Sequence, residues 1–345
     1  MKLALGAGYW GAGSTPEDQL ELVKEADRLG YDSVWVAEAY GSDVVTVLTW
    51  FAAHTKNIKL GSGILQMTAR APTMTAMTAA TLDILSEGRV LLGLGLSGPQ
   101  VVEGWYGVRY DQPIKRTREY IEIVRRVLAR EGPLEFDGDV YKLPLADSQG
   151  KALKLITHPL RADIPIYLAA IGPKNVRLAG EIADGWLPAF FSPEHSDDLL
   201  ENLGAGAEKV NRSVADIDIA PNALVSIGDD LESCFNWLRP AYGLYLGGMG
   251  SKKANFYNRL ATSYGFEDEA TKVQELFLSG DRFASYEAIP KELMDITGLA
   301  GPPDRIAERI KRYEKVGVGT LIVNPMAGTL EDRVAIIRQM KEIVS

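Results

Sequence analysis

Short β-rich runs alternate with longer segments of helical period along most of the 345-residue chain. The alternation begins with a strand at 2–9, a helix at 15–29, a strand at 33–38 and a helix at 43–54. Eight strands that alternate with helices predict a closed parallel (β/α)8 TIM barrel, and a doubly wound open sheet is the alternative. The other expected strands are 59–66, 90–95, 165–170, 186–188, 217–227 and 320–324, and the other expected helices are 72–86, 114–130, 174–183, 194–211, 229–242, 304–316 and 330–343.

Two stretches depart from this repeat, and we expect both to be insertions in one domain that spans 1–345. Residues 132–160 carry an Asp137-Gly138 turn between short β-prone runs, which predicts a surface hairpin. Residues 246–300 follow the seventh strand and are expected to be mainly helical. A segment at that point of the repeat is placed to cover the mouth of the barrel, where barrel enzymes bind their substrates.

Composition argues against several classes of function. The chain has 37 Lys and Arg against 46 Asp and Glu, a net charge of -9, which disfavours a nucleic-acid partner. It has neither a signal-peptide pattern nor an apolar stretch of about 20 residues, so we expect no membrane association. The single cysteine, Cys234, fits a reducing compartment and predicts a cytoplasmic location. The three histidines, at 54, 158 and 195, lie far apart, so we expect no metal site.

The run that most resembles a dinucleotide-binding turn is Gly93-Leu94-Gly95-Leu96-Ser97-Gly98, directly after a strand. In a dinucleotide-binding fold the third glycine lies within a helix, and an acidic residue ends the next strand. Here Pro99 follows at once and Glu119 falls inside an expected helix, so we reject that fold. The glycines still let a ligand approach the backbone closely at the end of strand four.

Two more strand ends carry glycine. The run Ala169-Ala170-Ile171-Gly172-Pro173-Lys174-Asn175 leads from strand five into a helix. The free N–H groups of such a helix start bind phosphate, although an ordinary βα turn needs the same residue types; Lys174 favours the anion. In strand three, Gly61-Ser62-Gly63-Ile64 indicates either a bulge that contacts a flat ligand or tight packing in the barrel wall.

Acidic and aromatic residues also gather at strand ends, which is where a barrel carries its catalytic groups. Glu38 ends strand two, and its carboxylate would either hydrogen-bond a substrate or cofactor or cap the following turn. Tyr9 and Trp10 end strand one, and Tyr40 follows Glu38. Together with Trp105 and Tyr106 these aromatics are candidate walls of a slot for a planar ring, although core packing accounts for any single one.

Five segments, in their order and spacing, resemble the bacterial luciferase-like superfamily, and within it the branch of oxidoreductases that use the deazaflavin coenzyme F420. The segments are LGYDSVWVAE at 29–38, IKLGSGI at 58–64, LSEGRVLLGLG at 85–95, IYLAA at 166–170 with Gly172 and Pro173, and IADGW at 182–186.

This resemblance implies a TIM barrel with the cofactor in its mouth and the cofactor phosphate on the helix start at 172–175. It also implies a bulge at Ser62-Gly63-Ile64, with a non-prolyl cis peptide that supports the cofactor ring. The loop from Ser97 and Gly98 to Gln100 and Val101 matches the segment that contacts the cofactor tail in the family. The expected cofactor-binding residues are Glu38, Ser62, Gly63, Ile64, Ser97, Gly98, Gln100, Val101, Ala169, Ala170, Gly172, Pro173, Lys174 and Asn175.

The function that the resemblance implies is hydride transfer between coenzyme F420 and a small organic substrate, with Glu38 as the first proton-transfer or orienting group and Tyr9 and Tyr40 behind it. The alternatives are an FMN-dependent two-component monooxygenase and a non-catalytic deazaflavin-binding protein. Relatives that act on sugar phosphates have a histidine after strand two and a cluster of basic residues, whereas this chain has Glu38-Ala39-Tyr40 and no such cluster. A sugar phosphate is therefore not the expected substrate. The family often pairs its barrels, so we expect a homodimer.

Overall fold

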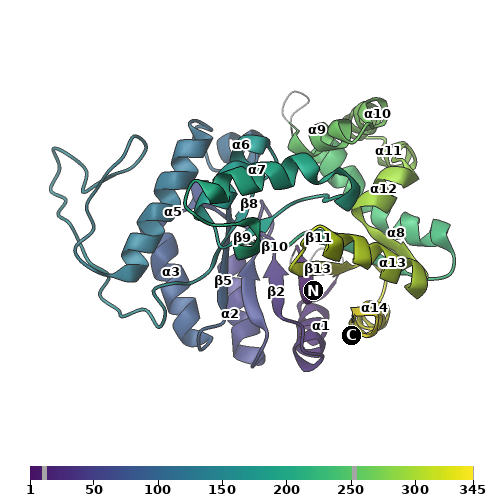
Figure 1. The fold of residues 1–345 in the computed structure, drawn as a ribbon, viewed down its shortest axis with the longest axis horizontal. Coiled ribbons are helices and arrows are strands. Elements are labelled where there is room, and N and C mark those ends of the chain that lie inside the picture. The colour runs from purple at the N-terminus through teal and green to yellow at the C-terminus, as the bar shows by residue number, and fades with distance from the viewer. Residues whose placement is uncertain (10–13, 251–254, 345) are drawn as a thin grey trace.

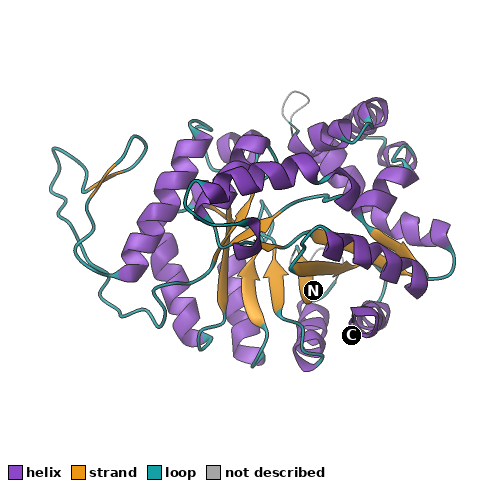
Figure 2. Ribbon diagram, in the orientation of Figure 1, coloured by secondary structure: helices purple, strands orange, loops and turns teal. Residues whose placement is uncertain are grey.

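A parallel sheet curls around the centre of the molecule, and helices cover its outer side (Figures 1 and 2). The computed structural model describes residues 1–9, 14–250 and 255–344. Strands alternate with helices along the chain, except that β3 leads directly into β4 and β10 into β11. The strands of the curled sheet are β1 (Lys2–Gly8), β2 (Ser33–Val36), β3 (Lys59–Ser62), β4 (Leu65–Gln66), β5 (Val90–Gly95), β8 (Ile166–Ala169), β9 (Gly185–Leu187), β10 (Asp218–Ile219), β11 (Asn222–Ile227), β12 (Leu299–Gly301) and β13 (Thr320–Pro325).

The sheet closes on itself through β10 and β11, which only Ala220 and Pro221 separate. On one side, β10 pairs with β9, and on the other, β11 pairs with β13, which in turn pairs with β1. The N–H of Gly319 also donates to the carbonyl of Ile219 at 3.1 Å. β3 and β4 together form one wall strand, and β10 and β11 form another, while β12 pairs with β11 as an additional strand. Eight strand positions therefore make a closed ring. The predicted TIM barrel is confirmed, and the open sheet is wrong.

The third wall strand is broken where the family resemblance implies a bulge. β3 ends at Ser62 and β4 begins at Leu65, and the peptide bond between Gly63 and Ile64 is cis. β3 pairs with both β2 and β5, whereas β4 pairs with β5. The break therefore lies in the upper part of the barrel, the end at which the strands finish.

The helices begin where the sequence places its capping signals. At the start of α1 the hydroxyl of Thr15 accepts a hydrogen bond from the N–H of Asp18, whose carboxylate accepts the N–H of Thr15. This reciprocal pair is the capping box that the Thr-Pro-Glu-Asp run supplies. The helices around the barrel are α1 (Pro16–Arg28), α2 (Val44–His54), α3 (Pro72–Leu85), α4 (Pro99–Gly104), α5 (Pro113–Ala129), α6 (Pro173–Ile182), α7 (Asp197–Glu208), α8 (Leu231–Gly243), α13 (Pro303–Lys315) and α14 (Leu330–Val344).

The lower interior of the barrel is filled by large side chains. The rings of Trp35 and Tyr167 meet edge to face with their centroids 5.0 Å apart, and they belong to one buried cluster with Leu91 and Ile322. A Cβ added at Gly61 would collide with the indole of Trp35, so glycine makes room for that ring. This layer, which we call the floor plug, closes the barrel below the break in strand three.

Two segments interrupt the alternation of strands and helices. In the first, β6 (Phe136–Asp137) and β7 (Lys142–Leu143) form an antiparallel hairpin. The carboxylate of Glu119 accepts the N–H groups of residues 139, 140 and 141 at 2.8–2.9 Å and so supports the turn. The second contains the π-helical turn η4 (Leu244–Gly248), α9 (Phe256–Ser263), α10 (Glu267–Ser279), α11 (Arg282–Glu287) and α12 (Lys291–Thr297).

Among the residues that the structure describes, no helix is both long and apolar enough to cross a membrane. The described part of the chain likewise brings together no group of three or more His, Cys, Asp or Glu side chains that could hold a metal ion. The single cysteine, Cys234, is a free and buried thiol in α8.

Candidate active site at the barrel mouth

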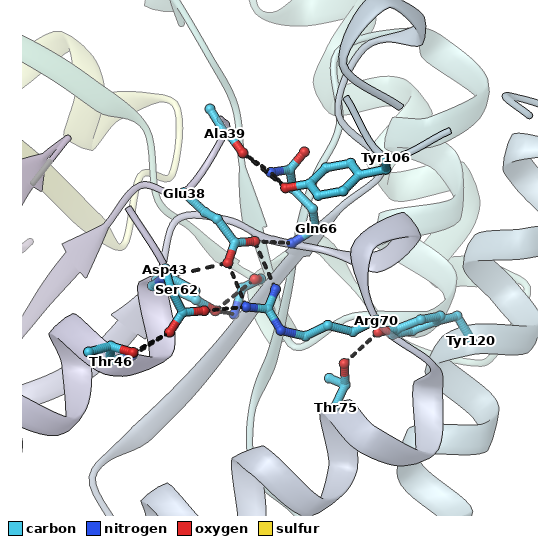
Figure 3. A network of polar contacts seen from close by, with 12 residues as sticks. Glu38, Ala39, Asp43, Thr46, Ser62, Gln66, Arg70, Thr75, Tyr106 and Tyr120 are labelled. Atoms are coloured by element: carbon cyan, nitrogen blue, oxygen red, sulfur yellow. Dashed lines mark hydrogen bonds and ion pairs between the residues drawn. The ribbon is translucent and has the colours of Figure 1, made fainter. Parts of the chain in front are cut away.

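A buried ion pair lies beside the carboxyl ends of strands two and three (Figure 3). Glu38, two residues beyond β2, is only 5% exposed. Its Oε2 accepts hydrogen bonds from the backbone N–H of Gln66 and from Nη1 of Arg70, both at 3.0 Å. Its Oε1 lies 2.8 Å from Nη2 of Arg70 and also accepts the N–H of Val44 at 3.5 Å. Both carboxylate oxygens are therefore occupied by partners within the protein.

Arg70 also reaches the start of α2. Its Nη2 forms an ion pair with Asp43, the N-cap residue of that helix, which accepts the N–H of Thr46 at 2.8 Å. Burial acts to raise the pKa of Asp43, but the hydrogen bonds from Thr46 and the charge of Arg70 outweigh it and lower the pKa. One guanidinium thus joins the segment after strand three to the loop after strand two.

The turn at Ala39 is held in an uncommon backbone conformation. Ala39 has φ +46°, in the left-handed region that non-glycine residues rarely adopt. Its carbonyl accepts hydrogen bonds from Nε2 of Gln66 and from the hydroxyl of Tyr106, the latter at 3.1 Å (Figure 3). Nε2 of Gln66 also donates to the Tyr106 hydroxyl at 3.0 Å. These bonds fix the loops after strands two, three and four relative to one another.

The break in strand three lies against glycines of strand four. The Ser62 hydroxyl donates to the Gly93 carbonyl at 2.8 Å and accepts the Gly93 N–H at 3.0 Å, so it serves the barrel wall. A Cβ added at Gly95 would collide with the end of the Ile64 side chain and would lie 3.5 Å from the Cβ of Ala169. The structure thus brings together Ile64, Gly95 and Ala169, which the sequence predicts from three separate segments.

The loop after strand four carries an unsatisfied polar group. Ser97 has φ +65°, Gly98 is the N-cap of α4, and Val101 is buried. Oε1 of Gln100 is buried without a hydrogen-bond partner. Oε1 of Gln66 is also buried without a hydrogen-bond partner. Buried acceptors normally have partners, so these two amide oxygens fit the presence of a bound polar ligand.

The start of α6 is open to solvent. Gly172 is the N-cap and Pro173 occupies the first helical position. A Cβ added at Gly172 would meet nothing within 4 Å, and the Lys174 side chain is exposed. The N–H groups of Asn175 and residue 176 turn back to the Gly172 carbonyl at 2.9 and 3.0 Å. Ala170 is buried at the end of strand five, and phosphate binding at this helix start stays a prediction.

The predicted tyrosines lie in different settings. The hydroxyl of Tyr9 is 3.3 Å from the hydroxyl of Tyr245, which the π-helical turn η4 presents from the second insertion. Burial raises the pKa of both phenols, so both keep their protons at neutral pH. Tyr40 is 49% exposed, and its ring centroid lies 6.5 Å from that of Trp105. Trp10 lies outside the described residues.

Sequence reasoning missed two partners in this region. Arg70 follows strand three. The available signal for it was Glu38 at the end of the neighbouring strand, because a buried acid there needs a basic partner. Tyr245 had no comparable signal, because a tyrosine in a helical stretch is ordinarily a packing residue. Neither residue stands close in the sequence to the group that it contacts.

A surface hollow of about 660 Å³ lies elsewhere, between α5, α6 and the start of β9. Four arginines line it, and two of them pair with acids there, Arg118 with Glu181 at 2.7 Å and Arg125 with Asp184 at 3.0 Å. Asp184 precedes β9, so this hollow lies toward the lower end of the barrel. It takes no part in the mouth.

A closed parallel barrel whose glycine-rich and polar segments meet at the upper strand ends defines a barrel enzyme of the kind that binds its ligands in the mouth. The family model of luciferase-like monooxygenases matches residues 3–320. The chain belongs to this family, which confirms the resemblance seen in the sequence.

The relatives are similar to this chain over most of its length. It is 47% identical over 337 residues to a Mycobacterium tuberculosis protein provisionally named a coenzyme F420-dependent oxidoreductase, covering 96% of both chains. It is 30% identical over 311 residues to the 5,10-methylenetetrahydromethanopterin reductase of Archaeoglobus fulgidus, covering 89% of both. Among solved structures, the F420-dependent tetrahydromethanopterin reductase of Methanopyrus kandleri superposes with a TM-score of 0.83 at 24% identity, covering 98% of this chain and 97% of that one.

Proposed function

We propose that this protein is an oxidoreductase that transfers hydride between coenzyme F420 and a small organic substrate. The observation that carries the proposal is the meeting of the Gly63–Ile64 break, Gly95 and Ala169 at one point of the barrel mouth. Gly95 makes room for the Ile64 side chain, which would then offer an apolar surface to a flat ring. The names of the relatives, two of which include F420, support this choice of cofactor.

The residues present fit such a cofactor. Gly63 and Ile64 would support its ring, while Ser62 would contribute through its backbone because its hydroxyl is bound to Gly93. The unsatisfied Oε1 of Gln100 suits the polar tail. The open start of α6 suits a phosphate, because helix N-termini and a lysine both attract anions.

The other expected contacts divide between the same two regions. Ser97, Gly98 and Val101 would contact the tail, and Ala169, Ala170, Gly172, Pro173, Lys174 and Asn175 would surround the phosphate. The bound cofactor supplies hydride chemistry, and the protein supplies orientation and proton transfer.

We assign Glu38 an orienting role, since Arg70 and the Gln66 N–H occupy both of its oxygens. It fixes the chain directly after the Gly63–Ile64 break and would keep that surface in place. Tyr9 is the preferred proton donor, because its phenol carries a proton at neutral pH and its hydroxyl contacts that of Tyr245, which could pass a proton to it. Tyr40 remains a substrate-facing candidate at the rim of the mouth.

Titration of the purified protein with oxidised F420 and, separately, with FMN tests the proposal through cofactor fluorescence. Tighter F420 binding supports it. Tighter FMN binding favours the two-component monooxygenase instead, and binding of F420 without turnover of any acceptor favours a carrier. Binding of neither cofactor would refute the assignment.

We further propose a homodimer. The outward face of α3 carries Met74, Met77, Ile84 and Leu85, which are 45–61% exposed. Their spacing makes one apolar stripe along the helix. A second copy is the occupant that we propose, because a two-fold axis would bury two such stripes together. A reducing, cytoplasmic compartment fits the free thiol of Cys234.

A further inference from the structure

Two asparagines face the barrel interior above the floor plug. Ile322 belongs to that plug, whereas Val323 packs against the helices outside. Because side chains alternate along a strand, Asn324 points inward like Ile322. A Cβ added at Gly6 of the neighbouring strand would collide with the Asn324 carboxamide, which confirms that this group extends across β1 inside the ring.

Asn222 of β11 stands next to Asn324. Nδ2 of Asn324 donates to Oδ1 of Asn222, and it also approaches the carbonyls of residues 223 and 322 at 3.4 and 3.5 Å. Asn222 is nevertheless exposed, although Ala220 just below it is fully buried. An inward side chain of a barrel wall can be exposed only if the upper interior is open, so this pair lies at the bottom of the mouth.

The pair presents an uncharged donor and acceptor to that space. Nδ2 of Asn222 and Oδ1 of Asn324 have no hydrogen-bond partner among the described residues, since the contacts of the pair are those given above. A carboxamide offers N–H and C=O groups without charge. Its natural complement is another amide, an imide or a carbonyl group.

We infer that Asn222, oriented by Asn324, binds an uncharged carbonyl or amide edge of a ligand held in the barrel mouth. The inference rests on the proposed function. Two sources share this chemistry, the pyrimidinedione edge of the deazaflavin ring and the carbonyl group of an uncharged substrate. Phosphates and carboxylates are disfavoured at this position, because Oδ1 of Asn324 would face them.

The test compares wild-type protein with Asn222→Ala and Asn222→Asp. Asn222→Asp keeps the size of the side chain but removes the donor. Asn202→Asp on α7, outside the barrel, is the matched control. Dissociation constants are measured for oxidised F420 by fluorescence, and for 2-cyclohexen-1-one as an uncharged carbonyl probe on the F420-loaded protein by calorimetry.

Loss of one such hydrogen bond predicts about tenfold weaker binding of the ligand that makes it. Weaker F420 binding assigns the pair to the cofactor ring. Unchanged F420 binding with weaker cyclohexenone binding assigns it to the substrate. If the Asn222 variants match the wild type for F420, and cyclohexenone binds all three equally or not at all, the inference is overturned while the proposed function stands. If the wild type itself fails to bind F420, the proposed function fails and takes the inference with it.

Discussion

The guanidinium of Arg70 contacts both carboxylate oxygens of Glu38, at 3.0 and 2.8 Å, although the two residues come from different strand ends. A two-point contact fixes orientation as well as distance. Its neighbours are the turn at Ala39 and the chain that follows the cis peptide. The pair therefore couples the loop after strand two to the surface proposed for the cofactor ring.

Replacing Glu38 by Gln should lower the free energy of unfolding by about 2 kcal/mol, because it leaves a largely buried guanidinium with Asp43 as its remaining acidic partner among the described residues. Urea unfolding measures the change. Glu21→Gln removes the exposed pair with Lys24 and should cost about 0.5 kcal/mol or less. An equal decrease in the free energy of unfolding for the two variants would contradict a stabilising role of the buried Glu38–Arg70 pair.

The same Glu38→Gln variant should reduce turnover much more than it weakens F420 binding. The expected reason is a shift of the chain after the Gly63–Ile64 break. Steady-state kinetics and a fluorescence titration separate the two effects. Unchanged turnover would show that Glu38 neither orients nor transfers a proton.

Tyr9→Phe should lower turnover about 100-fold if its hydroxyl supplies the proton, and Tyr245→Phe should lower it less, since it acts through Tyr9. Tyr31→Phe is the control, because this buried hydroxyl bonds the Ile337 carbonyl away from the mouth. F420 affinity should change little in all three. A turnover equal to wild type in Tyr9→Phe would remove Tyr9 from the mechanism.

Gly95→Ala should weaken F420 binding by about tenfold or more, because the new methyl group would displace the Ile64 side chain. Gly104→Ala adds the same methyl group at the end of α4, where it would meet nothing within 4 Å. Fluorescence titration of both variants provides the comparison. Equal affinities would show that the ring does not lie on Ile64.

Lys174→Ala should weaken F420 binding several-fold at low ionic strength, and the difference should shrink as salt screens the charge. Lys311→Ala, an exposed lysine of α13, serves as the control. If the effect of Lys174→Ala is absent at low salt, the phosphate lies elsewhere.

Met77→Glu should convert a dimer into monomers, because a charge would enter the buried stripe on α3. Light scattering coupled to size exclusion gives the mass. Phe283→Glu changes an even more exposed apolar residue on α11 and should leave the mass unchanged. A wild-type protein that is already monomeric would refute the dimer.

The barrel could be predicted because the hydrophobic period marks each wall strand and helix and local residues cap the helices, as Thr15 does at the start of α1. The hairpin at 132–160 also follows from local signals, whereas the glycines at 61 and 63 by themselves left a bulge and tight packing as alternatives. The pairing of Glu38 with Arg70 could not be predicted, because hydrophobic period reports which side of an element is buried and not which loops meet. Asn324 could have been named as a candidate site residue, because it is a polar residue at the end of a barrel strand, but its contact with Asn222 could not be predicted.

The role of the Ser62 side chain could not be predicted either. Its position in the wall was predicted, but its hydroxyl is bound to both backbone groups of Gly93. A residue type suited to ligand binding can equally tie two strands together, and only the positions of its neighbours distinguish the two roles.

The floor plug of Trp35 and Tyr167 closes the lower end of the barrel, so ligands enter and leave its interior through the mouth. Two ligands that are stacked in a space with one entrance cannot pass each other. A cofactor ring that lies against Ile64 must enter before a substrate that covers it and can leave only after the product has gone. With the cofactor ring placed as we propose, the packing of two aromatic rings at the bottom of the barrel would impose an order on binding and release at the top.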